Sequence, residues 1–487
     1  MEPVYASRGA VLSPEGDPTQ DDVVGKRRPI KGAEGSSAGG PTIVRRELLR
    51  YGVAGTAAVL LDLPRISGIA LSGPITPTAD QFDARVTTTW SDLSLELVRR
   101  TVGFSPPVAS RAFAYAGVAL YEALVPGIPG GRSLEGQFPG LIGLPLSGKN
   151  RVYHWPTVAN ACLASILRAL FTTATADSQT AIDTLEQTLA AELQTGLPRG
   201  VGRRSVERGR EVAMAVFEWS KRDGGHEGYL RNFPPDYVPP AGPGLWVSTP
   251  PAFLPALQPF WGSCRTFAVA SGTACASGDH TRYSEDPASR FFAEALEVYE
   301  SVNNLTSQQR DVALFWSDDP GATPTPPGHS ISILTQVLRQ ANAPLDLAAE
   351  AYARVGMAVA DAFICCWNTK YRYNLLRPVT YIQAHVDPGW MPLLVTPPFP
   401  EFTSGHSIQS GAAAQVLTDL LGDVSFTDHT HDERGLAPRS FDSFFEAAEE
   451  AAISRLYGGI HFRPAIERGL EQGRCIGEHV SAMTFRW

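Results

Sequence analysis

The chain has 487 residues, of which 43% are hydrophobic and 19% charged, and its formal net charge is −9. This composition is that of a globular protein with a sizeable core, long enough for one large domain or two to three ordinary ones. The negative balance excludes a general nucleic-acid binder, which needs a basic surface. It leaves room for a local anion site, because a few focused cations can oppose the overall charge.

The first 80 residues differ from the rest. Residues 1–44 are rich in Gly, Pro, Ser and charge without apolar periodicity, which predicts disorder. Arg45 and Arg46 then precede a weakly apolar stretch, and residues 70–72 read Ala-Leu-Ser. Residues 44–73 resemble a twin-arginine export signal, so we expect a periplasmic or extracellular protein. The alternative is a disordered tail followed by a short helix.

From about residue 81 to 487, apolar residues recur every three or four positions, which predicts helices. No stretch of 18 or more apolar residues occurs there, so we expect no integral membrane segment. The sequence therefore predicts one large all-α domain of packed helical bundles. The expected helices are 83–102, 108–125, 156–174, 177–195, 201–222, 287–303, 306–317, 329–341, 345–374, 404–422, 440–457 and 462–484. Long Pro- and Gly-rich connections are expected at 126–150, 223–285 and 378–403.

Six cysteines occur, and none of them forms a CxxC pair, which argues against thiolate zinc sites and thioredoxin chemistry. Cys365 and Cys366 are adjacent within a helical pattern, which indicates core positions. Cys264 and Cys275 could form a disulfide if the protein is exported.

The first chemical motif runs from Lys370 to Pro378. Lys370 and Arg377 are seven residues apart, about two helical turns, so one helix face could carry both. Pro378 disfavours helix at the residue before it, which places Arg377 at a helix end. Lys370 continues a predicted apolar row, and a lysine on a buried row needs an anionic partner. The alternative is a surface pair at a fraying helix end. The apolar row consists of Ala351, Val355, Val359, Phe363 and Cys366.

The second motif is Thr403-Ser404-Gly405-His406 at the start of a predicted helix. Thr403 or Ser404 can cap that helix, and Gly405 lets the backbone approach a ligand closely. Free N–H groups at a helix start favour an anion, and His406 would lie beside it. The alternative is an ordinary capped helix with an incidental histidine.

The third motif runs from Ser454-Arg455 to His461 and contains the pair Gly458-Gly459. Six helical residues would point Arg455 and His461 to different faces, so we expect the glycine pair to break the helix and let the two side chains converge. The alternative is a joint between helices with a solvent-facing arginine. Together the three motifs supply three cations, a hydroxyl, a close backbone and two imidazoles. This set suits a tetrahedral oxyanion, with one histidine as ligand or nucleophile and the other as acid or base.

At this point the sequence resembles a known superfamily. The patterns KxxxxxxRP, SGH and SRxxxxxH are similar to those shared by vanadium-dependent haloperoxidases and type 2 phosphatidic acid phosphatases, which include acid phosphatases. With PPGHS at 326–330, the resemblance covers roughly residues 85–485. It implies the helical vanadium chloroperoxidase and acid phosphatase-like fold, with vanadate as cofactor.

The resemblance implies a role for each matching residue. Three cations would hold the vanadate oxygens, and a hydroxyl and a backbone N–H would donate to them. These are Lys370, Arg377 and Arg455, followed by Ser404 and Gly405. His461 would bind vanadium axially through Nε2, and His406 would act as the acid or base. Lys370 would also polarise the bound peroxide.

Further residues are assigned through the same resemblance. Trp367 and Phe399 resemble the aromatic residues on the halide side of chloroperoxidase-type members, which points toward chloride. Core packing is the alternative for both. Asp318 and Asp319 are candidates to orient His406, and we expect Asp319 to do so, with an acidic turn at a helix end as the alternative.

The phosphatase pattern places an aspartate four residues after the last histidine, where this chain has Ala465. That leaves the partner of His461 unassigned and weighs against phosphatase chemistry. Asp428, His429, His431 and Asp432 could bind a divalent metal, but we expect a solvated loop there.

The implied function is a peroxidase that uses hydrogen peroxide to oxidise halide to hypohalous acid or an equivalent, which halogenates small organic acceptors. One alternative is an acid phosphatase with a phosphohistidine intermediate at His461. A second is a non-catalytic helical protein that binds an oxyanion. Nucleic acid is not an expected partner, and a homo-oligomer is left open.

Overall fold

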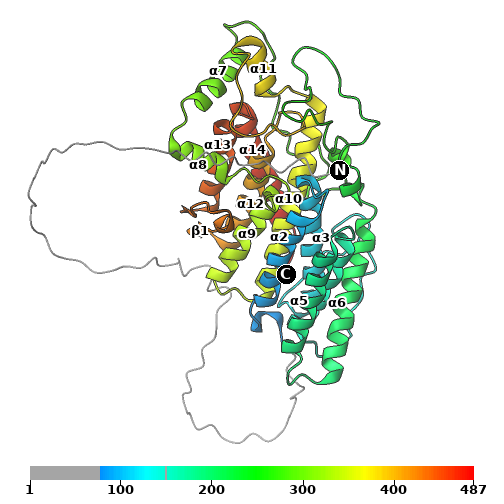
Figure 1. The fold of residues 1–487 in the computed structure, drawn as a ribbon. Coiled ribbons are helices and arrows are strands. Elements are labelled where there is room, and N and C mark those ends of the chain that lie inside the picture. The colour runs from blue at the N-terminus through cyan, green and yellow to red at the C-terminus, as the bar shows by residue number, and fades with distance from the viewer. Residues whose placement is uncertain (1–76, 149–150) are drawn as a thin grey trace, which may run out of the picture. The chain divides into compact units, whose positions relative to one another are not determined.

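The structure is a computed structural model that describes residues 77–148 and 151–487, so the predicted export signal at 44–73 lies outside it. The first half of the described chain forms five α-helices (Figure 1). They are α2 (Arg85–Arg100), α3 (Pro106–Leu124), α4 (Trp155–Leu170), α5 (Ala176–Leu193) and α6 (Arg199–Ser220). Prolines at the first positions of α3 and α4 start these helices, because proline lacks only an N–H that has no helical partner there.

The second half supplies the remaining helices and a two-stranded hairpin. The helices are α7 (Arg290–Asn303), α8 (Ser307–Phe315), α9 (Thr325–Gln340), α10 (Leu345–Tyr373), α11 (Pro378–His385), α12 (Gly405–Leu421), α13 (Phe444–Tyr457) and α14 (Arg463–Ser481). Strands β1 (Phe426–Asp428) and β2 (Arg439–Phe441) pair antiparallel, with Phe426 opposite Phe441. Short 3-10 turns are η2 (Ala79–Gln81), η3 (Val125–Gly127), η4 (Gly228–Leu230), η5 (Trp261–Ser263) and η6 (Asp432–Arg434).

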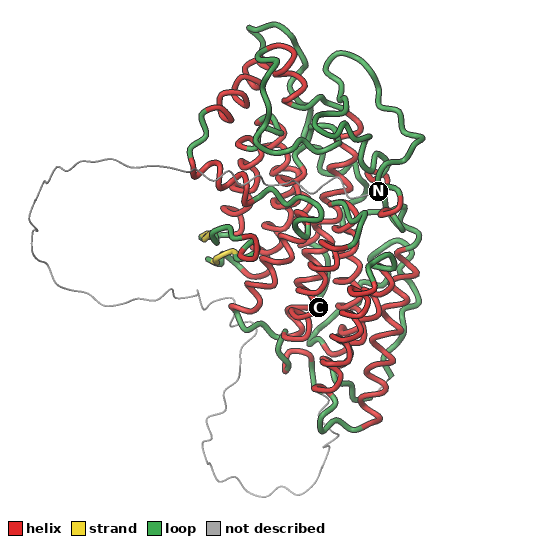
Figure 2. Tube along the Cα trace, in the orientation of Figure 1, coloured by secondary structure: helices red, strands yellow, loops and turns green. Residues whose placement is uncertain are grey.

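The predicted all-α architecture is confirmed, and Figure 2 shows how little strand accompanies the helices. Each predicted helix is present with shifted ends. The hairpin, the short 3-10 turns and α11, which lies within the predicted connection 378–403, were not predicted. The predicted disordered region reaches residue 80, but Ala79 within it is fully buried.

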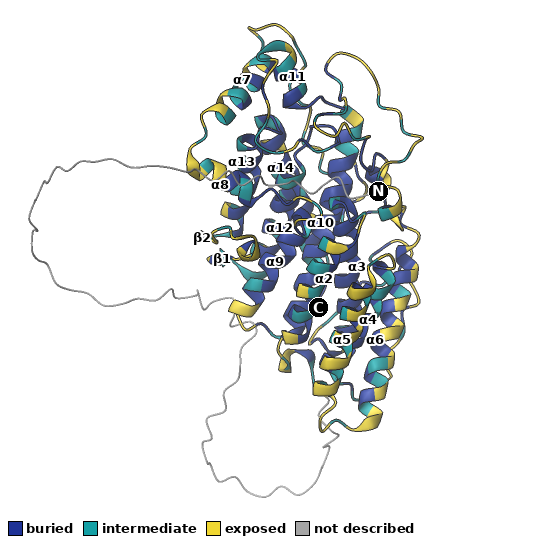
Figure 3. Ribbon diagram, in the orientation of Figure 1, coloured by how far each residue is buried: buried dark blue, intermediate teal, exposed yellow. Residues whose placement is uncertain are grey.

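Helix α10 is the centre of the packing. It lies against α3 on one side and against α12 and α14 on the other, and its side chains are buried along most of its length (Figure 3). The approach to α3 is close, because a Cβ built on Gly356 would lie 2.8 Å from the Phe113 carbonyl oxygen. Helices α4 and α6 complete one bundle with α3, and α13 completes the other with α12 and α14. The three sequence motifs all belong to the bundle of α10, α12, α13 and α14 and its connections.

One described stretch, Pro106–Gly127, has the length and hydropathy of a membrane span. In the structure, 89% of its apolar window is buried inside the protein. This burial is what a core helix shows, so the stretch gives little support for a membrane segment.

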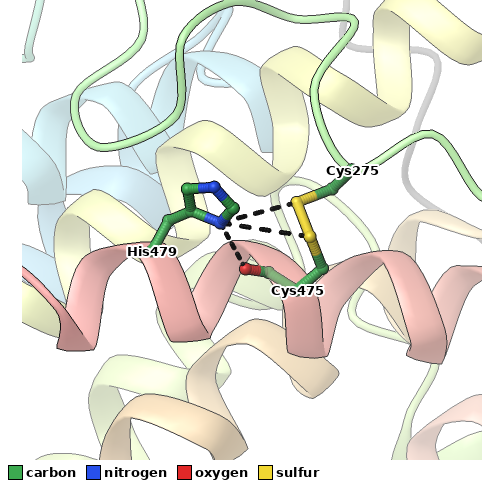
Figure 4. A group of neighbouring side chains, drawn as sticks. All are labelled: Cys275, Cys475 and His479. Carbon is green, nitrogen blue, oxygen red and sulfur yellow. Dashed lines mark hydrogen bonds between the residues drawn. A yellow bond between two sulfur atoms is a disulfide. The ribbon is translucent and has the colours of Figure 1, made fainter.

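The cysteines pair differently from the expectation. Cys275 forms a disulfide with Cys475 on α14, across a Cα–Cα distance of 5.8 Å, whereas Cys264 is buried as a free thiol. The predicted partner of Cys275 was therefore wrong, because connectivity depends on tertiary contacts between segments 200 residues apart. Figure 4 shows His479 beside this disulfide, its Nδ1 3.8 Å from the Cys275 sulfur. Cys365 and Cys366 are buried, as predicted.

The contact between α12 and α14 depends on glycine. A Cβ on Gly473 would overlap the Ile408 carbonyl oxygen of α12, whereas a Cβ on Gly200 of α6 would come no closer than 3.6 Å to Arg204. We predict that Gly473→Ala lowers the free energy of unfolding by about 1–3 kcal/mol, the usual cost of overpacking. The matched control Gly200→Ala should leave it unchanged or slightly raised. Denaturant titration checks both variants, and equal stabilities would contradict this description of the interface.

Candidate active site

The three sequence motifs meet in one buried place. The Arg377 guanidinium (Nη1) lies 3.2 Å from Nε2 of His461, which joins the first motif to the third. The Ser404 amide donates to the Ala465 carbonyl at 3.0 Å, which joins the second motif to the chain just after His461. Side chains separated by about ninety positions therefore surround a common space.

Lys370 ends the buried face of α10 and is completely shielded from solvent. Its Nζ donates to the Pro400 and Glu401 carbonyls, both at 2.9 Å, and lies 5.1 Å from the centre of the Phe399 ring. Burial lowers the pKa of Lys370 to about 7, with Arg377 contributing in the same direction. An anion bound next to Lys370 would therefore stabilise the charged form of the lysine.

Arg377 reaches the site by a different route from the one predicted. Helix α10 ends at Tyr373, Asn374 adopts a left-handed conformation (φ +49°), and Arg377 caps the start of α11 rather than ending α10. Its guanidinium donates to the carbonyls of Phe399 (2.8 Å) and Ile460 (2.7 Å), while Nη2 has no partner among the described residues. Burial lowers the pKa of Arg377 to about 10. A buried guanidinium nitrogen without an acceptor favours an anion beside it.

Ser404 is the N-cap of α12, as predicted, and its hydroxyl oxygen accepts from the Ser407 amide at 3.4 Å. Because that oxygen is the acceptor, its own O–H remains able to donate. Gly405 follows in the first helical position, where the N–H has no intrahelical acceptor. A Cβ on Gly405 would lie 3.9 Å from the Phe363 ring, so crowding within the protein does not require glycine here. The Ser404 O–H and the Gly405 N–H are therefore both available to donate to a ligand.

The side chain of His406 is 15% exposed, whereas that of His461 is 4% exposed. Its Nε2 has no hydrogen-bond partner among the described residues and lies 3.8 Å from the Asp318 carboxylate. Burial and Arg455 lower the pKa of His406 well below its ordinary value, while Asp318 opposes this shift. Asp319, the residue expected to orient His406, is exposed and makes no described contact with it. The structure brings Asp318 to this position instead.

Arg455 comes from the last turn of α13 and is 1% exposed. Its guanidinium donates to the Trp316 carbonyl at 2.5 Å and to the Ser454 hydroxyl at 2.9 Å. Burial lowers its pKa to about 10, and Asp318 and Asp319 oppose that effect. Helix α13 ends at Tyr457 and Gly459 has φ +76°, so the glycine pair breaks the helix as predicted.

His461 has a partner that sequence reasoning missed. The Glu401 carboxylate oxygen Oε1 lies 2.9 Å from His461 Nδ1 and accepts from the Phe462 amide at 2.9 Å. Since Oε1 acts as an acceptor, it assigns the ring proton to Nδ1 and leaves the lone pair on Nε2. Burial and then Arg377 lower the pKa of His461 well below its ordinary value, which keeps the ring neutral. An acidic residue isolated in the apolar run Pro397–Phe402 was the available signal.

The predicted halide-side aromatics lie together. Trp367 is 1% exposed and Phe399 is 9% exposed, and their ring centres are 4.9 Å apart. The Trp367 indole donates to the Leu257 carbonyl at 3.1 Å. Phe399 also covers Lys370 and Arg377, with the Arg377 guanidinium carbon 4.9 Å from its ring centre. These contacts make both rings part of the wall of the site.

The loop predicted to be solvated is only partly so. His429 and Asp432 are about half exposed, but Asp428 and His431 are 0% and 1% exposed. The prediction was wrong for the second pair, because those two side chains turn inward beside Asp318 and His329.

The electrostatics favour an anion at the centre of the three motifs. Three buried cations face this space, whereas Glu401 and Asp318 are the described buried carboxylates beside them. At an effective dielectric constant of about 20, two unit charges roughly 4 Å apart interact by about 4 kcal/mol, well above the value of an exposed ion pair. A tetrahedral oxyanion would also satisfy the unpaired Arg377 nitrogen.

The comparisons with known proteins agree with this geometry. Residues 350–487 match the family model described as the VCPO second helical-bundle domain. The structure is similar to that of the first bacterial vanadium-dependent iodoperoxidase, with 37% identity, 82% of this chain and 96% of that chain covered, and a TM-score of 0.75. The chain belongs to the vanadium-dependent haloperoxidase family.

More distant relatives share the fold. A holo-type bacterial vanadium-dependent chloroperoxidase aligns with a TM-score of 0.60 and 15% identity, over 79% of this chain and 93% of that one. Vanadium chloroperoxidase from Curvularia inaequalis is 26% identical, and the match covers 31% of this chain and 35% of that protein. The match thus spans about a third of the length of this curated relative.

The residues present fit vanadate, the group that the family binds. The buried nitrogens of Arg377 and His406 that have no partner among the described residues are groups that a polar ligand would satisfy. The lone pair on His461 Nε2 is suited to bind a metal centre.

The role of Glu401 is testable by vanadate binding. Burial raises the pKa of Glu401 to about 7, so above that pH its carboxylate is ionised and supports His461 as a donor. We predict that Glu401→Gln weakens orthovanadate binding at pH 8.5 about tenfold or more, because the amide carries no charge. The matched control is Glu467→Gln, an exposed carboxylate on α14. Calorimetric titration of both variants measures the effect, and equal affinities would remove Glu401 from the account.

The depressed pKa of Lys370 predicts coupled proton uptake. Above pH 7 the empty site holds a largely neutral lysine, and a bound dianion stabilises its charged form, so binding takes up a proton. Tungstate titrated at pH 8.5 in two buffers of different ionisation enthalpy should show this uptake, which should vanish near pH 5.5. Lys370→Gln should abolish it, while Lys221→Gln on the surface should not. Unchanged uptake in Lys370→Gln would contradict the prediction.

Proposed function

We propose that this chain is a vanadate-dependent haloperoxidase that oxidises halide with hydrogen peroxide to hypohalous acid or an equivalent. The released oxidant halogenates small organic acceptors. One observation carries the proposal. Three buried cations, Lys370, Arg377 and Arg455, lie around His461, a neutral histidine whose Nε2 lone pair faces them. These cations, with Ser404, Gly405 and His461, are called the cage. The 37% identity to a bacterial iodoperoxidase supports it further.

The cage residues divide the work of holding the cofactor. Lys370, Arg377 and Arg455 balance its negative charge. The Ser404 hydroxyl and the Gly405 N–H would donate to its oxygens, and His461 Nε2 would bind the vanadium. When bound, vanadate supplies Lewis-acid activation of peroxide without a change of oxidation state.

The chain's own residues control protons and polarity. His406 is neutral at working pH and partly exposed, so it can accept a proton from incoming hydrogen peroxide and return it to the product. Asp318 stabilises the protonated form of His406. Lys370, as a cation, would polarise a peroxide oxygen held next to it. Trp367 and Phe399 exclude water from one side of the site.

Iodide is the first halide to test, because the similarity to the iodoperoxidase covers most of this chain. Phe399, through the resemblance noted in the sequence, keeps chloride as a further expected substrate. We also propose export by the twin-arginine route. Arg45 and Arg46 support it, as does the disulfide Cys275–Cys475, since disulfides persist in oxidising compartments.

A phosphatase is the second candidate, favoured by the Glu401–His461 pair. A neutral imidazole oriented by a carboxylate is also the form that attacks phosphorus, and phosphate has the shape and charge of vanadate. Hydrolysis of p-nitrophenyl phosphate by the vanadate-free protein, abolished by added vanadate, would support this activity.

The proposal is tested by reconstitution. The metal-free protein should brominate or iodinate a dye with hydrogen peroxide only after addition of orthovanadate. His406→Ala should lower this rate by about a hundredfold or more, while vanadate affinity changes only a few-fold. His429→Ala, on an exposed histidine, is the control. Vanadate binding without turnover of any halide would instead favour a non-catalytic oxyanion-binding protein.

A further inference from the structure

Four buried titratable side chains lie behind His406, outside the cage. They come from separate segments: the α8–α9 connection, α9, β1 and the loop after β1. Each is at most 2% exposed, and they are Asp318, His329, Asp428 and His431. Buried ionisable groups are costly unless they are paired, and a cluster of them beside a candidate site residue is a candidate for a functional role.

His329 is held between two carboxylates. Its Nδ1 lies 2.9 Å from the Asp318 carboxylate and its Nε2 lies 2.7 Å from the Asp428 carboxylate. Ionised carboxylates only accept hydrogen bonds, so both ring nitrogens must carry a proton. Burial opposes this charge, but Asp318 and Asp428 outweigh it and raise the pKa of His329 to about 10. The ring also stacks on Trp316, with centres 4.4 Å apart, a favourable place for a cation.

Asp318 connects this imidazolium to the active site. The same oxygen that faces His329 lies 3.8 Å from His406 Nε2, and the other oxygen lies 3.2 Å from His431 Nε2. Burial alone would raise the pKa of Asp318, but His329 and His431 hold it well below its ordinary value. Asp318 therefore stays ionised beside His406.

Asp318, His329 and Asp428 form a hydrogen-bonded row, and Asp428 lies at the end away from His406. Its second oxygen accepts from the Thr430 amide at 2.9 Å and from the Thr430 hydroxyl at 2.6 Å. The side chain is fully buried and anchors His329 to β1.

We propose that His329 is a positioning residue for the acid–base step, acting as a fixed imidazolium that keeps Asp318 ionised and aimed at His406. Asp428 holds His329 in that state. The inference rests on the proposed function, because His406 is the group that handles the proton there. The row also reaches the cage, since Arg455 donates to the Trp316 carbonyl two residues before Asp318.

A metal ion bound by the buried cluster is the alternative to a protonated His329. Asp318, His329 and His431 each offer one ligand atom, all within 4.8 Å of one another. We favour the proton, because a ring with a carboxylate at each nitrogen has no free lone pair for a metal. The metal content of the purified protein decides this point: about one zinc or similar ion per chain, lost in His329→Gln, would overturn the proposal.

The charge of His329 is measured directly by NMR of protein labelled with 15N at histidine. We expect one imidazole to keep both ring protons at pH 8.5, with chemical shifts typical of an imidazolium. Asp428→Asn should restore its titration to lower pH. A spectrum in which each histidine is neutral at pH 8.5 would overturn the proposal, whether or not the variants fold.

A double-mutant cycle tests the coupling to Asp318. We expect His329→Gln to lower kcat about tenfold in the wild-type background. In the Asp318→Asn background the same substitution should lower kcat less than twofold, because His329 acts through the Asp318 carboxylate. Vanadate affinity should stay within a few-fold, and His429→Gln should be silent. Equal factors in both backgrounds would overturn the proposal. Absence of halide oxidation by the wild-type protein would instead contradict the proposed function, while NMR still reports the state of His329.

Discussion

The structure depends on the desolvation of three cations in one small space. Lys370, Arg377 and Arg455 are each at most 1% exposed, and few carboxylates accompany them. Backbone carbonyls satisfy many of their N–H groups but supply only partial charge, which is why burial depresses the pKa of each. A bound oxyanion would offset this cost, which is why the three cations favour vanadate beside them.

The fold holds this arrangement through close backbone contacts. Helix α10 delivers Lys370 at the end of a buried face, and the tight α12–α14 contact fixes Ser404 and His406 next to the chain around His461. The segment 316–318 touches Arg455, His406 and the buried His329 row together. A shift in any of these contacts would move charges relative to one another, and at low dielectric small displacements change large energies.

The sequence was informative where local chemistry decides the outcome. Helical periodicity predicted nearly all the helices, Ser404 was a recognisable cap, and the glycine pair after Arg455 was a recognisable break. Helix α11 escaped because eight residues in a Pro-rich stretch give little periodicity. Glu401, His329 and the Cys275–Cys475 pair depend on contacts between distant segments, which no local pattern encodes. The choice of Asp319 failed for the same reason, since neighbouring aspartates differ only in the direction that the turn gives them.

The central claim is that these side chains form one cage for vanadate, bonded through His461. A crystal structure of the protein soaked with orthovanadate tests it most directly. The account predicts vanadium within bonding distance of His461 Nε2, with its oxygens facing Lys370, Arg377 and Arg455. Vanadium bound elsewhere, or a cage that stays without it at saturating concentration, would contradict the account.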